Sequence, residues 1–296
     1  MGVEVLQISV GSFKWVADTI DNEVMGINAM GTGIANIMGK AEIYDKLIAS
    51  IPQEMKSAIA GVALTLIALF LLLDFIKKST DLKWVTWENV LMFFLKFIIA
   101  KVCVDNSEWL MSCIYNGFNS LTDMGLMVTE IIPWNGDNKA LRYQFFLSGA
   151  DAGKLISPPS IMWYDFTPVG LWLMVIVQSF LMKAIMAVTF IIVLARFMEL
   201  TIYTIAAPLP LATFGSDGLQ DIGKSYLKSY AACCIHAMVI LLIFASYGAL
   251  NTALNAYPNA MDSIGAGGIM GLIKTFILGA TIMKSEQWAK RICGAI

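Results

Sequence analysis

One segment of the sequence matches a pattern that performs chemistry in other proteins. Residues 218–225 read Gly-Leu-Gln-Asp-Ile-Gly-Lys-Ser, which fits G-x-x-x-x-G-K-S, the phosphate-binding loop of nucleotide hydrolases. That loop needs a buried strand before it and a parallel sheet around it. Here two prolines precede the segment, an apolar run follows it, and nothing else in the chain indicates a parallel sheet. We therefore expect a turn that leads into a helix, and not an ATP site.

The cysteines and the only histidine form no recognisable site either. No two of the five cysteines have C-x-x-C spacing, and most of them lie in apolar runs, where a free cysteine packs as a small hydrophobic residue. His236 has no companion that would complete a zinc site or a Ser/His or Cys/His pair. We expect no catalytic residue, no metal and no cofactor, and therefore a protein that is not an enzyme.

Four lysines lie in or near apolar runs, namely Lys96, Lys101, Lys183 and Lys274. A charge at bilayer depth costs at least about 2.5–3.5 kcal/mol, so such residues face protein or water. Lys101 is near the end of its run and can extend its ammonium group to the interface. Two interpretations remain for the deeper lysines, Lys183 and Lys274. They line a pore that carries an anionic passenger such as single-stranded DNA, or they form hydrogen bonds between helices and salt bridges to another subunit.

Small residues at helical spacing predict faces where helix backbones approach closely. They occur in one run of four and at the start of the first apolar span: Gly267, Gly271, Thr275 and Gly279, and Ser57 and Gly61. These faces are candidates for packing within one helix bundle or between subunits.

The composition explains why charges in apolar runs matter here. The chain has 296 residues, of which 58% are hydrophobic and only 14% are charged, and its net charge is -2. Its mean hydropathy is +0.71. A soluble domain carries roughly 25% charged residues, so this chain cannot cover a globular surface with polar groups. The composition excludes an ordinary soluble enzyme and indicates lipid as the solvent.

The apolar runs predict an all-α polytopic membrane protein with about five transmembrane helices. About twenty helical residues cross a hydrocarbon core, and the expected spans are residues 57–76, 90–104, 169–195, 231–250 and 268–283. The apolar run 200–214 contains Pro208 and Pro210, and we expect it to be re-entrant or interfacial rather than a straight span.

The positions of lysine and arginine predict the orientation. Residues 102–138 and 229–273 contain no Lys or Arg, whereas the other connections between spans do. Since cytoplasmic loops carry the excess of basic residues, the N-terminus should lie outside and the C-terminus in the cytoplasm. We expect a multi-pass protein of a bacterial cell membrane.

Four regions follow from this arrangement. Residues 1–56 read as an amphipathic helical region, outside or interfacial, with breaks at its glycines: Gly26, Gly31, Gly33 and Gly39. Residues 57–104 hold the first two spans. Residues 105–167 form an extracytoplasmic helical subdomain, and its apolar stripe predicts a helix over 106–132. Residues 168–296 hold spans three to five, with a cytoplasmic loop at 196–229.

One segment of the last region resembles a known family. Residues 196–214 read Arg-Phe-Met-Glu-Leu-Thr-Ile-Tyr-Thr-Ile-Ala-Ala-Pro-Leu-Pro-Leu-Ala-Thr-Phe and lead into Gly218-Leu-Gln-Asp-Ile-Gly-Lys-Ser-Tyr-Leu-Lys-Ser-Tyr. This stretch resembles the TrbL-type polytopic membrane component of conjugative type IV secretion systems, in the version carried by mobile elements of Gram-positive gut bacteria. The positions that carry the resemblance are an arginine, a glutamate three residues on, and an A-P-x-P stretch: Arg196, Glu199, Ala207, Pro208 and Pro210. The likeness extends more loosely from about residue 50 onward.

The resemblance implies a function. The protein would be a structural channel subunit of a conjugation machine, would form a homo-oligomer within membrane lipid, and would help to translocate single-stranded DNA and protein substrates. Its partners would be the other membrane proteins and the ATPases of that machine, with transient contact to the DNA. The alternative is a stand-alone multi-pass transporter or channel for a small solute, which paired broken helices would favour. Only one broken segment, near Pro208, is visible.

Overall fold

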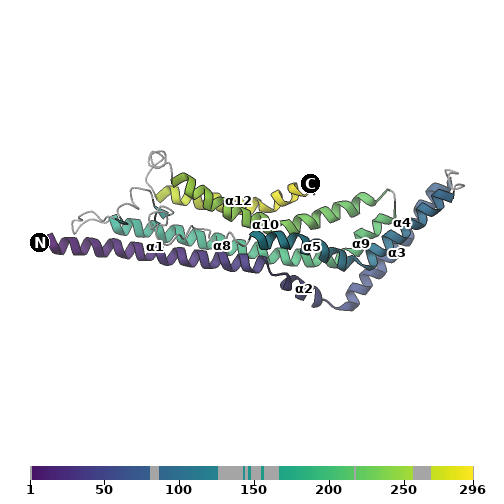
Figure 1. The fold of residues 1–296 in the computed structure, drawn as a ribbon, viewed down its shortest axis with the longest axis horizontal. Coiled ribbons are helices and arrows are strands. Elements are labelled where there is room, and N and C mark those ends of the chain that lie inside the picture. Colours follow the sequence, from purple (N-terminus) through teal and green to yellow (C-terminus); the bar gives the residue numbers. More distant parts are fainter. Residues whose placement is uncertain are drawn as a thin grey trace. The chain divides into compact units, whose positions relative to one another are not determined.

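The chain is helical throughout the part that the computed structural model describes, in agreement with the all-α expectation (Figure 1). The described residues are 2–80, 87–125, 143, 146–147, 155–156, 167–216, 218–255 and 268–295. The helices are α1 (Gly2–Met38), α2 (Ala41–Ala49), α3 (Gln53–Thr80), α4 (Trp87–Asp105), α5 (Ser107–Gly125), α8 (Thr167–Ala206), α9 (Pro208–Leu211), the 3-10 helix η2 (Ala212–Gly215), α10 (Gln220–Asn255) and α12 (Gly268–Ile292).

Three of these helices are long and apolar enough to cross a membrane, by length and composition. The candidate spans are Gln53–Lys77 in α3, Pro168–Ala206 in α8 and Gln220–Asn251 in α10. They contain the first, third and fourth of the spans expected from the sequence. A protein with these helices has the character of a membrane protein.

The other two expected spans coincide with α4 and α12, which are helices with lysines in their interior. In the region 105–167, α5 accounts for the first part of the helix expected over 106–132. Most of that region beyond Gly125 lies outside the described residues.

The run 200–214 is divided between three elements. Residues up to Ala206 continue α8, which is therefore longer than the expected span 169–195. Pro208 then occupies the first turn of the short helix α9, where its missing N–H is not needed, and η2 follows directly. The break falls between Ala206 and Pro208 because a proline inside α8 would remove a helical hydrogen bond and clash with the preceding turn.

The chain contains two compact units. Unit 1 comprises residues 1–38, 125–193 and 238–285, and unit 2 comprises residues 39–124, 194–237 and 286–296. Helices α8, α10 and α12 contribute residues to both.

Unit 1 contains α1 and parts of α8, α10 and α12. Helix α1 continues through Gly26, Gly31 and Gly33, so the breaks expected there are absent, and the helix ends just before Gly39. One side of α1 is buried at a spacing of three or four residues: Phe13, Val16, Ile20, Val24, Ile27, Gly31, Ile34 and Met38. This spacing makes a single apolar stripe along the helix, as in an amphipathic helix that packs on a neighbour.

Unit 2 contains α2 to α5, α9, η2 and the remaining parts of α8, α10 and α12. The short elements α9 and η2 pack on α3 and α4. A Cβ built at Gly215 would lie 3.5 Å from the Ala100 side chain and 3.9 Å from that of Ile67. The proline segment is therefore enclosed by protein on this side.

Candidate functional site

The strongest candidate for a functional residue in unit 2 is a buried arginine. Arg196 lies in α8 and is only 2% exposed. Its Nε donates to the backbone oxygen of Cys233 and its Nη2 donates to that of Cys234, each at 2.9 Å, so both bonds reach α10. The planar guanidinium group suits two neighbouring acceptors. Arg196 thereby ties α8 to α10 within unit 2.

No carboxylate of the described residues is paired with the Arg196 guanidinium. Among the residues that the structure describes, Arg196 forms no ion pair, and its Nη1 has no hydrogen-bond partner. Glu199, one turn further along α8, is half-buried. A buried cation is costly unless its donors are satisfied, so the two carbonyl groups carry most of its stabilisation.

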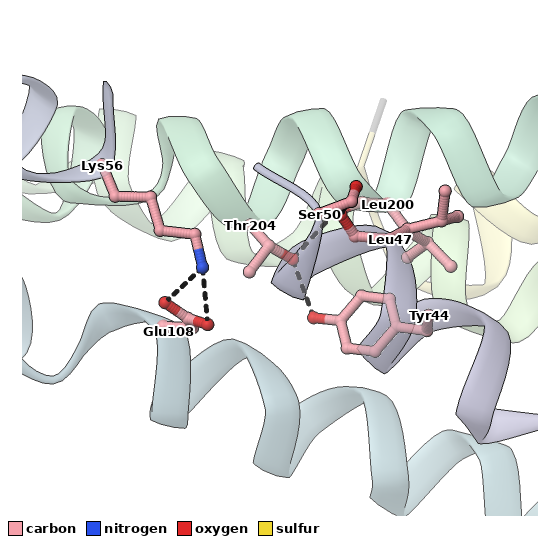
Figure 2. Close-up of polar contacts among 7 residues, drawn as sticks. All are labelled: Tyr44, Leu47, Ser50, Lys56, Glu108, Leu200 and Thr204. Carbon is pink, nitrogen blue, oxygen red and sulfur yellow. Dashed lines mark hydrogen bonds and ion pairs between the residues drawn. The ribbon is translucent and has the colours of Figure 1, made fainter. Parts of the chain in front are cut away.

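A cluster of tyrosines lies in the same unit. The hydroxyl oxygen of Tyr44 is 2.8 Å from Thr204 Oγ1 and 2.9 Å from the hydroxyl oxygen of Tyr230. Thr204 Oγ1 also donates to the backbone oxygen of Leu200 at 2.9 Å, and Tyr230 donates to that of Met111 at 3.1 Å. The contact between Tyr44 and Thr204 is visible in Figure 2. We call these hydroxyl groups of Tyr44, Thr204 and Tyr230 the hydroxyl network; it joins α2, α8, α10 and α5.

Tyr115 packs against this network through its ring but not through its hydroxyl. Its ring stacks on that of Tyr44 with 4.0 Å between the centroids, while its hydroxyl has no hydrogen-bond partner. Burial raises the pKa of Tyr115 to about 12, although the charge of Arg196 acts in the opposite direction. Burial also raises the pKa of Tyr44. Both phenols are therefore neutral at physiological pH.

A cavity of about 290 Å³ lies beside the hydroxyl network, between α2, α3, α4, α5 and α8. Its wall contains an ion pair in which Lys56 Nζ is 3.0 and 3.2 Å from the two carboxylate oxygens of Glu108 (Figure 2). Thr204 and Pro208 line the same cavity. A second, apolar groove of about 440 Å³ runs between α2, α3 and α8.

Pro208 and Pro210, which carry the resemblance noted above, lie in a segment that is bonded to α10 and α3. Thr213 Oγ1 donates to the backbone oxygen of Pro210 at 2.7 Å and accepts the backbone N–H of Gly223 at 3.1 Å. That N–H belongs to the first turn of α10, where helical partners are absent. Ser216 Oγ also donates to Asp74 Oδ1 at 3.0 Å. The segment thus caps α10 and contacts the end of α3.

Residues 218–225 do not form a phosphate-binding loop. The segment starts in a turn after the 3-10 helix η2, and it is helical from Gln220. Lys224 is exposed and pairs with Asp221 at 3.3 Å. A Cβ at Gly223 would lie 3.0 Å from both the Phe214 ring and the Pro210 oxygen, so a glycine is needed there for packing.

The four predicted lysines are divided between the two units. In unit 1, Lys183 Nζ lies 2.6 Å from Glu23 Oε2 and forms an ion pair with α1. Lys274 is 4% exposed, and its Nζ donates to Asn251 Oδ1 at 2.9 Å. On α4, Lys96 is half-buried and Lys101 is exposed. Lys183 and Lys274 therefore have partners within the chain.

The two predicted packing faces differ. A Cβ at Gly271 would lie 2.8 Å from the Cδ and Nε2 atoms of Gln178, and one at Gly279 would lie 3.1 Å from Ile185 Cδ1, so α12 approaches α8 closely in unit 1. Thr275 is buried on the same face. In contrast, Ser57 and Gly61 on α3 are exposed, and a Cβ at Gly61 would meet nothing. Gly267 lies outside the described residues.

The sequence did not single out Tyr44, Tyr115, Tyr230 or the two partners of the lysines, Glu23 and Asn251. The signal for Glu23 was available, because it interrupts the apolar stripe of α1 next to Val24. Within the described ranges, no group of His, Cys, Asp and Glu residues could hold a metal ion, and all five cysteines are free. In comparisons with known proteins, no family, no curated protein and no solved structure matches the chain.

Proposed function

We propose that the chain is a structural channel subunit of a conjugative type IV secretion machine. In this proposal it forms a homo-oligomer in a bacterial cell membrane and helps single-stranded DNA and protein substrates to cross. The protein itself is not an enzyme; separate ATPases supply the energy. Its membrane arrangement is about five spans, with the N-terminus outside, the C-terminus in the cytoplasm and an extracytoplasmic region between the second and third spans.

The observation that carries the proposal is the large apolar surface of the candidate spans. Only 22% of the apolar window of α3 and 33% of that of α8 is buried within the chain. Soluble monomers rarely expose apolar patches of such extent, and larger patches mark contact with lipid or other subunits. A membrane subunit with much surface left for partners fits this pattern, and the resemblance of residues 196–214 to the TrbL-type component indicates which machine.

The buried polar residues also fit a structural rather than a catalytic subunit. Arg196 and the hydroxyl network connect helices within unit 2. Such buried networks fix the relative positions of helices when all of their members are engaged. In this proposal the arginine and the proline segment hold one helix arrangement, against which other subunits assemble.

A gene deletion tests the proposal most directly. In a donor cell that carries the conjugative element, deletion should abolish DNA transfer without an effect on growth, and the intact gene supplied in trans should restore transfer. Normal transfer from the deletion strain would contradict the proposal. Genes for a relaxase and a conjugation ATPase beside this gene would support it, and an isolated locus would count against it.

The alternative, a stand-alone transporter for a small solute, has one observation in its favour. The 290 Å³ cavity has an ion pair in its wall and lies next to the helix break at Pro208. Broken helices and charged side chains are typical of solute sites in transporters. Growth of the deletion strain on media limited for single nutrients separates the two. A specific growth defect with normal transfer would favour the transporter.

A further inference from the structure

Helix α1 lies along the candidate span of α8 within unit 1. Figure 1 shows the two helices side by side. Two contacts establish this: the rings of Trp15 and Trp172 stack with 5.0 Å between their centroids, and Glu23 pairs with Lys183 at 2.6 Å. A Cβ at Gly26 would also meet Lys183 Cε, at 3.9 Å. Glu23 follows Trp15 on α1, and its partner Lys183 likewise follows Trp172 on α8, so the two helices run parallel. Residues at this level of α8 and of α1 therefore share one depth.

The fully exposed residues of α8 in unit 1 are all apolar, and the partly exposed Lys183 is paired with Glu23. Its large exposed side chains between Pro168 and Val193 are Val169, Leu173, Met174, Val177, Phe180, Val188, Phe190 and Ile191. Exposed side chains of the same kind continue on the neighbouring helices, with Leu242 on α10 and Phe276 on α12. A surface of this composition is suited to lipid chains.

The exposed side of α1 is different. Opposite its buried stripe, the exposed residues of the described part recur at helical spacing: Lys14, Asp18, Asn22, Met25, Ala29, Gly33 and Asn36. Met25 is the large apolar side chain in this stripe, and Trp15, 48% exposed and stacked on Trp172, lies at its edge. Charged and amide side chains at the depth of lipid chains are costly, unless they face protein or water. One side of unit 1 therefore suits lipid, and the side covered by α1 does not.

We propose that the exposed polar stripe of α1 borders a water-filled passage through the membrane, at the same depth as the lipid-facing side of α8. This inference rests on the proposed function, since it identifies the surface of the channel subunit that lines the lumen. The stripe carries one lysine and one aspartate among amide and small residues, and it lacks the basic groove with aromatic platforms that binds single-stranded nucleic acid. Its role is to keep the passage wet without retaining an anionic passenger.

This assignment differs from the pore interpretation of the deep lysines. Lys183 and Lys274 are engaged with Glu23 and Asn251 inside unit 1. The ion pair of Lys183 instead fastens the lining helix α1 to the span α8. Helix α1, expected from the sequence to lie outside the membrane or at its interface, becomes the lining. Since α1 runs parallel to α8, an odd number of crossings lies between them, so in this inference α3 crosses the membrane and α4 does not. The inference thereby departs from the two spans proposed for residues 57–104.

The test compares single cysteines at one depth on the two sides of unit 1. The two substitutions are Asn22→Cys on α1 and Phe180→Cys on α8. Each lies within one turn before its helix's member of the Glu23–Lys183 pair, and both positions are exposed, Phe180 by 74%. Each is introduced into the full chain with its five native cysteines changed to alanine. Reaction with a charged, membrane-impermeant thiol reagent is followed in native membrane fragments that are open on both sides.

We expect the cysteine at position 22 to react roughly fiftyfold faster or more than the cysteine at position 180, because a charged reagent enters water but not lipid. Equal, fast reaction would show that this level of α8 lies outside the bilayer, and it would overturn the inference. Slow reaction at position 22 would also overturn it, since another protein or lipid would then cover the stripe. A second pair, Asp18→Cys and Val177→Cys, repeats the measurement if a variant of the first pair does not fold.

The outcome is separate from the transfer assay. The labelling pattern reports where α1 lies, whatever passes through the membrane. If the deletion strain transfers DNA normally but the labelling is as expected, the conjugation function fails and the water-lined α1 stands. If transfer is abolished but position 22 is protected, the function stands and the lining must be sought elsewhere in the chain.

Discussion

Unit 1 and unit 2 both hold polar side chains among apolar helices, but they connect them differently. In unit 1 the polar contacts are separate pairs, Lys183 with Glu23 and Lys274 with Asn251. In unit 2 the hydroxyl groups form a network that joins four helices, and Arg196 bridges two adjacent carbonyl groups. Substitutions in separate pairs have additive effects on the free energy of unfolding, whereas substitutions within one network do not. We therefore expect substitutions to be additive in unit 1 and coupled in unit 2.

The largest change in stability is expected for substitutions of Arg196 in unit 2. Arg196→Lys keeps the buried charge but loses the rigid pair of donors, so one charge-assisted hydrogen bond is lost and the protein is destabilised by about 1.5–3 kcal/mol. Arg196→Met removes the charge, and the carbonyl groups of Cys233 and Cys234 keep only their contacts within α10. This variant should therefore destabilise the protein less than Arg196→Lys does. The measurement is the midpoint of thermal unfolding of the purified protein in detergent.

The matched control for Arg196 is Lys274→Met in unit 1, which removes the charge from a single pair. We expect its effect to be smaller than that of Arg196→Lys. A lysine at position 196 that unfolds at the temperature of the unmodified protein would show that the two carbonyl contacts do not hold unit 2 together.

The next effect concerns the two faces of small residues. Gly271→Leu places a side chain where the Gln178 amide lies and should destabilise unit 1 by about 1–3 kcal/mol or more. Gly61→Leu is the same substitution on an open surface of unit 2 and should change stability by less than about 1 kcal/mol. Thermal unfolding of both variants is compared. Equal destabilisation would mean that the α3 face is also closely packed in the assembled protein.

A smaller effect tests additivity itself. Tyr44→Phe and Tyr230→Phe should each cost about 1 kcal/mol, and together they should deviate from the sum by about 0.5 kcal/mol or more, because they share a hydrogen bond. In unit 1, Lys183→Gln and Lys274→Met should add to within about 0.5 kcal/mol. Double-mutant cycles from denaturant unfolding give both numbers. If the effects of Lys183→Gln and Lys274→Met on stability are not additive, the predicted difference between the two units is wrong.

The smallest effect at neutral pH is expected at Tyr115. Its hydroxyl has no partner, so Tyr115→Phe should be neutral or slightly stabilising near pH 7. The difference should grow with pH. The pKa of Tyr115 is raised from 10.0 to about 12 by burial, so the unfolded chain releases this proton first, and the native protein loses stability as the pH rises above about 10. Unfolding is measured at intervals between pH 8 and 11. The stability of the Phe variant relative to the unmodified protein should rise with pH, and a constant difference would contradict the burial of this phenol.

The sequence predicted the helices of this protein better than their partners. The apolar runs indicated all three candidate spans because a span is a local property of about twenty residues. The glycines of α1 did not break the helix, since packing along one side stabilises it against a weak local preference. The end of α8 at Ala206 was also predictable in kind, because Pro208 cannot continue a helix.

The contacts within the candidate site could not be predicted, because their members are far apart in sequence. Tyr44 is separated from Thr204 by 160 positions and from Tyr230 by 186. Gly61 and Gly271 look alike in the sequence and differ only in what lies opposite them. Pairing of this kind depends on the tertiary arrangement and leaves no local pattern. The partners of Lys183 and Lys274 were visible only in three dimensions.

The hydroxyl network has a consequence that its heavy atoms alone do not reveal. Tyr44, Thr204 and Tyr230 supply three hydroxyl hydrogens for four oxygen–oxygen contacts, two of which end on carbonyl groups that can only accept. Thr204 donates to Leu200 and Tyr230 donates to Met111, so the Tyr44 hydrogen can go to either Thr204 or Tyr230, and one of these two contacts lacks a hydrogen. The oxygen atoms can therefore keep their positions while the Tyr44 hydroxyl alternates between two acceptors.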